Sequence, residues 1–431
     1  MLGWLKKLLQ HFLIKIEHKI EISSRMKLPH IIRKEIQSML CPNYTEELLG
    51  LKDVFVKSIE RIGNTLCIHA AMYQRIHKCP RCGERTSKVH DYRTQRIKDI
   101  SAFGEITYIY LRKRRHVCPV CNKKFYEQVP FLPKYHRMTS RLVAYVINSL
   151  QGIGSMKSVA KSANISQHTV ARIFDQVEYF NKELPRVLSI DEFRGNADGE
   201  KFQCIVTDPE NKVVLDILPN RKTEDLTGYF LSFKDRKKVQ YFVIDMSGPY
   251  KNLAQSLFPR AKIIADRYHV VRQVIWAFEN VRKNEQAKFH DARRKYFKRS
   301  RKLLLKKTES LSEEEAAQVA AMLNVSERLR QAYRMKNEFH KLMKCKSREE
   351  AKKQLGIWNM MAVGYNLPEF EACTKTFINW QEEILNSFEY PYTNGYTEGV
   401  NNKIKVIKRN AFGVRNFKRF RNRILHVMSK A

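Results

Sequence analysis

Three carboxylates stand in contexts that suit metal-assisted chemistry on phosphodiesters. Asp191 is expected to end the buried strand of the segment RVLSIDEF, and Asp245 to end that of VQYFVIDMSGPY. Glu398 is the single acid between Tyr390 and the C-terminus, and ten Lys and Arg residues follow it. Carboxylates held a few ångströms apart repel one another, and divalent cations remove that penalty. Two Mg²⁺ ions about 3.5–4 Å apart can activate an attacking oxygen and stabilise a leaving one, using the oxygen ligands that Asp and Glu supply.

The elements around the first two acids decide whether they meet. RVLSIDEF is typical of a buried strand, KFQCIVTD and KVVLDILP of an antiparallel hairpin, and VQYFVIDMSGPY of another strand ending in an acid. A helix (YKNLAQSLFP) and a further strand (AKIIADRYHV) follow. This is the order of an RNase H-like core, in which the first and fourth strands lie side by side. We therefore predict that Asp191 and Asp245 converge, although a single acid at a strand end is usually a turn residue.

A helix beginning near Gly395 would bring Glu398 to the same place. Its apolar side would consist of Val400, Ile404 and Ile407, with Glu398 on the opposite stripe. A salt bridge is the alternative role for Glu398, but one acid neutralises little among so many bases. We therefore predict a third metal ligand. The basic residues after it are expected to contact phosphates: Lys403, Lys405, Lys408 and Arg409.

Two CxxC pairs predict a second metal site. CPRCG carries Cys79 and Cys82, and CPVCNKKF carries Cys118 and Cys121. Two residues between thiolates let both sulfurs reach one tetrahedral zinc, and two such pairs complete a closed, structural Zn²⁺ site. The alternative is a set of buried free cysteines. His77, His90 and His116 are possible substitute ligands, and the basic run Arg112 to Arg115 suggests that the module lies against phosphates.

A helix-turn-helix is predicted over residues 155–177. SMKSVAKSANISQHTVARIFDQV gives a short helix, a turn around Ala163 to Ile165, and a second helix for which Ser166 is a suitable N-cap. An ordinary helical hairpin is the alternative. In the helix-turn-helix interpretation four side chains of the second helix face a major groove: Gln167, His168, Thr169 and Arg172.

Composition narrows the class of partner. The 431 residues include 80 Lys and Arg against 44 Asp and Glu, a formal charge of +36. Such a surplus predicts a polyanionic partner, nucleic acid first and an acidic membrane surface second. No apolar run is long enough for a membrane span, so we expect no membrane association. Nine cysteines, four of them in CxxC pairs, fit metal binding in a reducing cytoplasm better than a disulfide scaffold.

Three segments together resemble a known family. SIDEF, VIDMSGPYKNLAQSLFPRAKIIADRYHVV and NGYTEGVNNKIKVIKRNAFGVRNFKRFRNRIL are similar to the DDE transposases of bacterial insertion sequences, of the ISL3 type. The resemblance implies that Asp191, Asp245 and Glu398 form a catalytic triad on two metal ions, Mg²⁺ or Mn²⁺. It also implies an auxiliary role for Asp266 and His269 of the DRYH segment. Asp266 could instead be the second triad member, and His269 could be a hydrogen-bonded core histidine.

The expected organisation is an α+β multidomain chain. SLSEEEAAQVAAML begins with a capping box of Ser312 and Glu315, and much of the interval from Asp245 to Glu398 reads as helices. We predict an amphipathic extension, a four-cysteine zinc-binding module, a helix-turn-helix domain, the first part of an RNase H-like α/β catalytic core, an all-helical insertion and a final helical part of the core. The boundaries are 1–44, 45–135, 136–183, 184–269, 270–390 and 391–431.

The family implies a transposase that binds the terminal inverted repeats of its insertion sequence and then cleaves and transfers DNA strands. Its partners would be double-stranded DNA, both terminal repeats and target, and further copies of itself in a homodimer or higher oligomer. We expect it in the cytoplasm, associated with the nucleoid. The alternatives are a catalytically inactive DNA-binding regulator derived from a transposase, and a structure-selective nuclease on the same fold.

Overall fold

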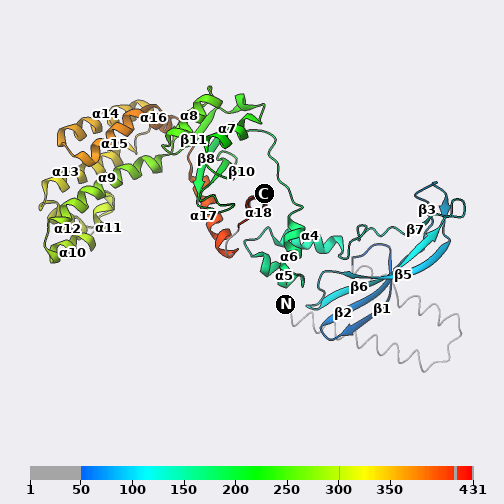
Figure 1. Cartoon of the computed structure of the whole chain (residues 1–431). Coiled ribbons are helices and arrows are strands. Elements are labelled where there is room, and N and C mark those ends of the chain that lie inside the picture. The colour runs from blue at the N-terminus through cyan, green and yellow to red at the C-terminus, as the bar shows by residue number, and fades with distance from the viewer. Residues whose placement is uncertain (1–49, 300, 412–414, 430–431) are drawn as a thin grey trace. The chain divides into compact units, whose positions relative to one another are not determined.

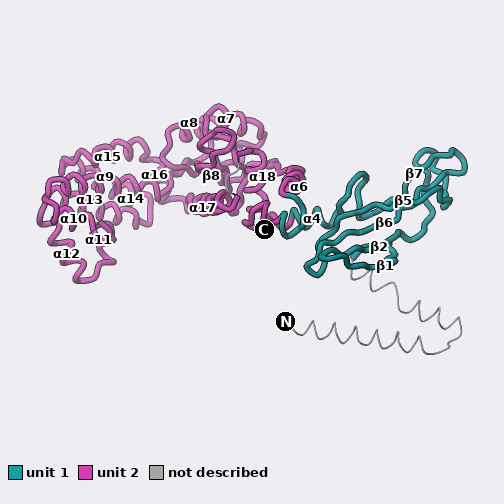
Figure 2. The backbone as a smooth tube through the Cα atoms, turned by 60° about the horizontal axis from the view of Figure 1, so that its bottom comes forward, with its two compact units in different colours: residues 1–147, 160–166 teal, residues 148–159, 167–431 magenta. Residues whose placement is uncertain are grey.

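The computed structural model describes residues 50–299, 301–411 and 415–429. The chain divides into two compact units: residues 1–147 with 160–166, and residues 148–159 with 167–431 (Figure 2). The amphipathic extension predicted over residues 1–44 lies outside the described residues.

The first unit is built on a five-stranded sheet. Four strands lie in the order β1-β2-β6-β5, and β7 pairs with β6. The β2–β6 pair is parallel, and the β1–β2, β5–β6 and β6–β7 pairs are antiparallel. Ile68, Ile97 and Ile109 are fully buried in its core. The strands span Val54–Ile62 (β1), Thr65–Met72 (β2), Val89–Lys98 (β5), Ile106–Val117 (β6) and Lys124–Tyr126 (β7).

Shorter elements complete the N-terminal half of the chain. A two-stranded hairpin pairs β3 (His77–Lys78) with β4 (Arg85–Thr86). Buried Asp99 accepts hydrogen bonds from Thr139 and Arg141 and so holds the start of α4 against the first sheet. Three helices follow one another: α4 (Ser140–Ser149), α5 (Met156–Ser162) and α6 (Gln167–Phe174).

The second unit contains a five-stranded mixed sheet with the order β10-β9-β8-β11-β12. Strands β8, β9 and β10 are antiparallel neighbours, whereas β8, β11 and β12 run parallel. The first strand of this sheet therefore lies beside the fourth, as the sequence predicted. The strands span Val187–Phe193 (β8), Gln203–Asp208 (β9), Val213–Leu218 (β10), Tyr241–Ile244 (β11) and Lys262–Ala265 (β12).

Helices cover both faces of this sheet. Leu188 and Ile190 face α7 (Thr223–Leu231) and α8 (Gly248–Leu257) in one core. On the other face, Phe193 and Ile205 pack with side chains of α17 (Gly395–Asn410) and α18 (Phe417–Met428). Because successive side chains of a strand point to opposite faces, the odd-numbered residues of β8 point toward α17.

The interval between the sheet and α17 is helical, as predicted. Figure 1 shows helices α10 to α15 gathered together, with α16 returning to the sheet, where Asn386 donates a hydrogen bond to the carbonyl of Ile263 in β12. Ser312 and Glu315 form the predicted capping box at the start of α12. The helices span Arg267–Ala287 (α9), Asp291–Arg299 (α10), Arg301–Leu305 (α11), Glu313–Leu323 (α12), Glu327–Leu342 (α13), Arg348–Tyr365 (α14), Pro368–Asn379 (α15) and Gln381–Glu389 (α16), with 3₁₀ turns at Arg236–Lys238 and Thr308–Ser310.

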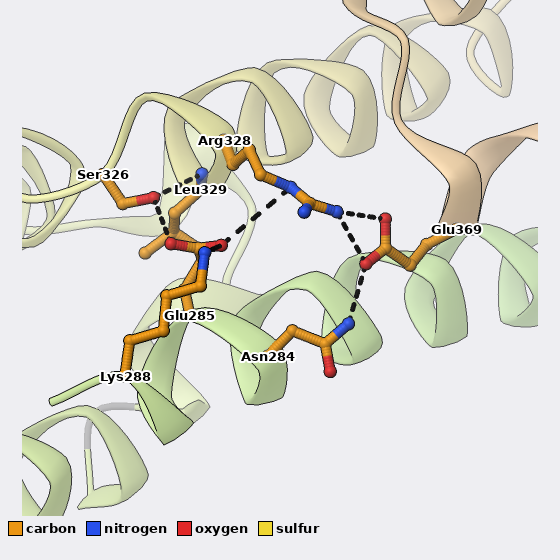
Figure 3. Close-up of polar contacts among 7 residues, drawn as sticks. All are labelled: Asn284, Glu285, Lys288, Ser326, Arg328, Leu329 and Glu369. Atoms are coloured by element: carbon orange, nitrogen blue, oxygen red, sulfur yellow. Dashed lines mark hydrogen bonds and ion pairs between the residues drawn. The ribbon is translucent and has the colours of Figure 1, made fainter.

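A polar network joins three of these helices (Figure 3). Arg328 of α13 donates two hydrogen bonds to Glu369 of α15, at 2.8 and 2.9 Å, and Asn284 of α9 donates a third to the same carboxylate. Glu285 of α9 accepts from Ser326, whose hydroxyl also caps α13. The network holds α13 and α15 against α9, and these polar contacts add to the apolar packing of the helical segment.

The C-terminal helix α18 holds two segments, the one between α4 and α5 and the one that follows α6. Arg419 pairs with Asp175, and Arg423 donates to the carbonyls of Gly152 and Gly154. Asn422 donates to the carbonyl of Val177. Among the described residues, no helix combines the length and apolar character needed to cross a bilayer.

Candidate active site and metal-binding module

Three aspartates line up along one edge of the second sheet. Register pairs Ser189 of β8 with Val243 of β11, and Ile244 of β11 with Ala265 of β12. Continuing each register places Asp245 between Asp191 and Asp266. Each aspartate follows a residue of one apolar cluster by an even number of positions. That cluster consists of Val187, Val243 and Ile264, which lie on a single face of the sheet. Strand periodicity therefore directs the three carboxylates to the same side of the sheet.

Glu398 reaches this edge from α17. The helix begins at Gly395, and Val400, Ile404 and Ile407 are buried as the sequence predicted. Glu398 lies in its first turns and is half-buried, and one of its carboxylate oxygens lies within 4.8 Å of ligand atoms of both Asp266 and His269. Helix α17 thus places the Glu398 carboxylate close to Asp266, although the two residues are far apart in the sequence.

Buried polar contacts fix the start of α17 on the sheet. The side chain of Asn394 contacts the hydroxyl of Ser189, and its backbone N–H donates to Asp266 Oδ1 at 3.2 Å. The hydroxyls of Thr397 and Thr207 are 2.8 Å apart. Asn394, Ser189, Thr397 and Thr207 are all fully buried. These contacts leave α17 little freedom to slide, so the position of Glu398 is set by the fold.

The first aspartate is oriented by α17 as well. Asn401 Nδ2 donates to Asp191 Oδ2 at 2.8 Å, and the backbone N–H of Glu192 donates to Asp191 Oδ1 at 2.7 Å. By contrast, Asp245 Oδ1 and Asp266 Oδ2 are buried and find no hydrogen-bond partner among the described residues. Buried carboxylate oxygens without donors are costly unless a cation occupies the space between them. The donor set therefore fits a hard divalent cation.

The electrostatics of the cluster agree with this geometry. Burial, with the neighbouring Asp245 and Glu398, raises the pKa of Asp191 from 3.8 to about 6. Burial also raises the pKa of Asp245, of Asp266 and of Glu398, with Asp266 adding to the effect on Asp245 and on Glu398. His269 lowers all four pKa values. Crowded acids with raised pKa values are a common feature of functional sites.

The auxiliary residues lie inside the cluster. Asp266 follows β12 directly and occupies the N-cap position of α9, and His269 lies in the first turn of that helix. His269 is half-buried, and its ring faces the ligand atoms of Asp266 and Glu398. The structure thus groups Asp266 and His269 directly with Glu398, so Asp266 remains the alternative to Asp245 as the second acid.

A small cavity opens beside Asp245. It has a volume of about 180 Å³ and is lined by Asp245, Met246 and four residues of α9: His269, Arg272, Gln273 and Trp276. The guanidinium of Arg272 lies 4.4 Å from the ring centroid of Trp276, which is half-exposed. An aromatic ring and a cation next to the carboxylates suit contact with a nucleotide strand.

Of the four basic residues of α17 that were predicted to contact phosphates, one is used in a contact with another segment of the protein. Lys403, Lys405 and Arg409 are exposed. Lys408 is only half-exposed, and its Nζ donates to the carbonyl of Arg194 at 2.9 Å. Lys408 therefore ties α17 to the loop after β8, and the three exposed residues are the ones available to a ligand.

The four predicted zinc ligands come together in the first unit. Sγ of Cys79 lies 3.5 Å from Sγ of Cys121, and Sγ of Cys82 lies 3.5 Å from Sγ of Cys118. All four sulfurs lie within 4.8 Å of one another. Burial acts to raise the pKa of Cys79, but the N–H groups of Cys82 and Arg81 outweigh it and lower that pKa to about 6. The arrangement fits a tetrahedral zinc site with no open position.

The two cysteine pairs are held by matching turns. Cys79 accepts through its carbonyl from Gly83 N–H at 3.0 Å, and Cys118 does the same from Asn122 N–H at 3.0 Å. Gly83 and Asn122 both have positive φ, 75° and 56°. Glycine adopts this conformation freely, and asparagine tolerates it better than most residues. The sequence thus supplies each turn with a residue that its backbone requires.

A basic groove runs along the same module. It has a volume of about 1170 Å³, and among the described residues that line it Glu127 is the only acid. Of the predicted basic run, Lys113 lines the groove, whereas Arg114 is paired with Glu127 at 3.1 Å and Arg115 with Asp91 at 3.3 Å. The groove fits a polyanionic backbone. Its cationic lining consists of Lys78, Arg93, Arg96, Lys98, Lys113, Lys123, Lys124, Lys134 and Arg137.

The predicted helix-turn-helix has the expected elements. Residues 163–166 separate α5 from α6, and α6 begins at Gln167, directly after the predicted N-cap Ser166. Val170 and Ile173 are buried. Gln167, His168 and Arg172 are exposed and Thr169 is half-buried, so α6 presents the first three to solvent.

Sequence reasoning missed the residues that position the acids. Asn394, Asn401 and Ser189 were given no role, although Asn394 and Asn401 lie within the segment that carries Glu398. The available signal was helical spacing. Asn401 follows Glu398 by three residues, which places both on neighbouring parts of one helix surface.

Family models match three successive parts of the chain. Residues 75–121 match the model described as "zinc-finger of transposase IS204/IS1001/IS1096/IS1165". Residues 127–178 match the "Helix-turn-helix domain of transposase family ISL3". Residues 188–424, more than half of the chain, match the ISL3-type DDE model described as "Transposase".

Two relatives share parts of this sequence. The chain is 27% identical over 392 residues to the "Transposase for insertion sequence element IS1001" of Bordetella parapertussis, covering 88% of this chain and 96% of that protein. A shorter match, 33% identical over 108 residues, is to a protein of Lactococcus lactis subsp. lactis named "ATP-dependent protease"; it covers 25% of this chain and 33% of that protein.

Proposed function

Because the chain belongs to the ISL3 family of transposases, we propose that it binds the terminal inverted repeats of its insertion sequence and there catalyses metal-dependent DNA strand cleavage and strand transfer. Its zinc-finger and helix-turn-helix domains are DNA-binding modules of that family. The proposal concerns what the family match leaves open: the residues that act, the metal and the DNA that is recognised.

We assign the metal site to Asp191, Asp245 and Glu398. The observation that carries the assignment is the convergence of acids from β8, β11 and α17, together with the buried Oδ1 of Asp245, which lacks a hydrogen-bond partner among the described residues. Two Mg²⁺ or Mn²⁺ ions bound there would supply the charge that activates a water or 3′-hydroxyl and stabilises the leaving oxygen. The strand order β10-β9-β8-β11-β12 supports describing the sheet as an RNase H-like core.

The neighbouring residues keep this site in order. Asn401 orients Asp191 through the 2.8 Å hydrogen bond, so the Asp191 oxygens keep one direction. Asp266 accepts from the N–H of Asn394 and so anchors the start of α17, which carries Glu398. His269 lies beside Asp266 and Glu398, where its ring can contact both carboxylates. In this account Asp266 and His269 are positioning residues, and Asp245 is the second ligand.

DNA recognition is assigned to the N-terminal modules. The exposed residues of α6, Gln167, His168 and Arg172, are placed to read base edges, while the basic groove of the zinc-binding module follows the phosphate backbone. We propose that Lys403, Lys405 and Arg409 hold the strand near the acids. Pairing two element ends requires a homodimer or a higher oligomer. A chain that works on the bacterial chromosome would lie in the cytoplasm with the nucleoid.

The test is cleavage of a labelled duplex carrying the end of the element, with Mg²⁺ or Mn²⁺. We expect the native chain to cut at the end, Asp191→Ala, Asp245→Ala and Glu398→Ala to lose cutting while still binding the duplex, and Asp266→Ala to retain part of it. If Asp266→Ala abolishes cutting and Asp245→Ala does not, the second ligand is Asp266. If the native chain binds the end but never cuts it, the regulator alternative replaces the enzyme.

A further inference from the structure

A second cluster of metal-binding side chains lies next to the four cysteines. His77, His116 and Glu127 each offer one ligand atom, and these three atoms lie within 4.8 Å of one another. They come from β3, from β6 and from the residue after β7. His116 and Glu127 are buried, and His77 is half-buried. The chain thus brings together two imidazoles and a carboxylate from segments far apart in sequence.

His116 carries the argument because its ring lacks partners. Its side chain is fully buried, and neither Nδ1 nor Nε2 has a hydrogen-bond partner among the described residues. A neutral imidazole has one donor and one acceptor nitrogen, and burying both without partners is unfavourable. A cation bound to the acceptor nitrogen removes the larger part of that penalty.

The other two ligands are already oriented. Glu127 Oε1 accepts from the backbone N–H of Arg114 at 2.7 Å, and Oε2 accepts from Arg114 Nη1 at 3.1 Å. A carboxylate has about four acceptor positions, so these two bonds leave room for a metal. Arg114 also donates to the carbonyl of Met72, which fixes the guanidinium. The rings of His77 and His116 lie 4.6 Å apart between centroids.

The two histidines occupy equivalent places. His77 is two residues before Cys79, and His116 is two residues before Cys118. His77 lies in β3 and His116 in β6, and each strand ends one residue before the first cysteine of its pair, so each cysteine pair has a histidine on the strand that leads into it. The four-thiolate site is complete without them. Their ring nitrogens therefore belong to a neighbouring site.

We propose that His77, His116 and Glu127 bind a second divalent metal ion of the zinc class, separate from the four-thiolate zinc. Two nitrogens and one oxygen suit Zn²⁺, Co²⁺ or Ni²⁺, and a three-ligand site keeps one position open. Tetrahedral bonds of about 2.0–2.2 Å place ligands about 3.3–3.6 Å apart. The three ligand atoms now lie within 4.8 Å of one another, so ion binding requires side-chain rotations that draw them together. The ion joins β3, β6 and the residue after β7, and one of its ligands, Glu127, also lines the basic groove.

The test counts zinc in the purified full-length chain after zinc loading and gel filtration. Native protein is compared with His77→Gln, His116→Gln and the control His90→Gln, an exposed histidine of β5 outside the cluster. We expect His77→Gln and His116→Gln to hold one zinc ion fewer per chain than native protein and His90→Gln. Zinc-edge X-ray absorption should show sulfur with nitrogen or oxygen ligands in native protein and fewer light-atom ligands in the two variants.

Cobalt substitution shows whether a variant still folds, because the thiolate-to-cobalt charge-transfer band reports the four-cysteine site alone. His77→Gln is the milder change, since His77 is only half-buried. Equal zinc counts in native protein and all three variants would overturn the proposal. Loss of the charge-transfer band together with the extra ion in His77→Gln would also overturn it, because the histidines would then support the thiolate site.

Discussion

Replacing Asp245 by Asn should stabilise the metal-free protein. The rise of the Asp191 pKa from 3.8 to about 6 corresponds to about 3 kcal/mol of destabilisation of the ionised folded state. Burial is the largest cause and Asp245 is a further one, so removing the Asp245 charge should recover only part of this energy, on the order of 1 kcal/mol. For a unit of this size, that amount raises the melting temperature by about 2–4 °C.

The sign depends on pH. A carboxyl group whose pKa is raised on folding destabilises the folded state once the unfolded chain is ionised, and the effect is complete above the folded pKa. For Asp191 the destabilisation therefore grows from about pH 4 and is complete above about pH 6. The gain from Asp245→Asn should be full at neutral pH and shrink toward pH 5, where Asp191 is protonated.

The assay is thermal unfolding followed by scanning calorimetry, with EDTA and with MgCl₂. Native protein should gain stability from Mg²⁺, and Asp245→Asn should be more stable than native protein in EDTA but gain little from Mg²⁺. The matched control is Asp216→Asn in the same sheet, because Asp216 is buried and paired with Arg421 at 2.5 Å. That variant should lose stability in EDTA and keep its response to Mg²⁺. A less stable Asp245→Asn in EDTA, or an undiminished Mg²⁺ response, would refute the reasoning.

Three further predictions concern single modules. Asn401→Ala removes the hydrogen bond that orients Asp191. It should lower the rate of end cleavage about tenfold, which raises the activation free energy by about 1.4 kcal/mol, and leave duplex affinity unchanged in a gel-shift assay. An equal loss of affinity would contradict an orienting role. Cys118→Ser, or zinc chelation, should abolish end binding yet leave the Mg²⁺-dependent stabilisation of the second unit, and loss of both together would show that the modules do not fold separately. Trp276→Ala should reduce cleavage more than binding, because its ring lines the cavity beside Asp245; Ile378→Ala, an exposed apolar residue of α15, is the control and should leave cleavage at the native level.

The elements of the second unit were largely predictable from sequence. Apolar runs marked β8 and β11, and period-3.6 spacing marked α17, because burial on one or two faces imposes those patterns. The adjacency of β8 and β11 followed from the order of elements. The four-cysteine cluster followed from spacing alone. Each of these features follows either from a local sequence pattern or from the order of the strands and helices along the chain.

What escaped prediction depends on contacts between distant segments. Asn394 and Asn401 look like solvent-facing residues of a polar helix, yet both are buried against β8. Arg114 looks available to phosphate, but pairing with Glu127 across β6 and β7 removes it. Asp191 lies two residues before the end of β8. The pairing of β8 with β11 stops at Ser189, but its pairing with β9 continues to Phe193. No local pattern encodes such pairings.

The most direct test of the metal-ligand assignment is a change of metal preference. Asp245→Cys and Glu398→Cys replace a hard oxygen ligand by a thiolate, which binds Mn²⁺ better than Mg²⁺. We predict that both variants bind the element end, fail to cut it with Mg²⁺ and recover cutting with Mn²⁺, while Asp266→Cys behaves alike in both metals. Variants that bind the end but stay inactive in both metals, or that cut normally with Mg²⁺, would contradict the assignment of Asp245 and Glu398 as metal ligands.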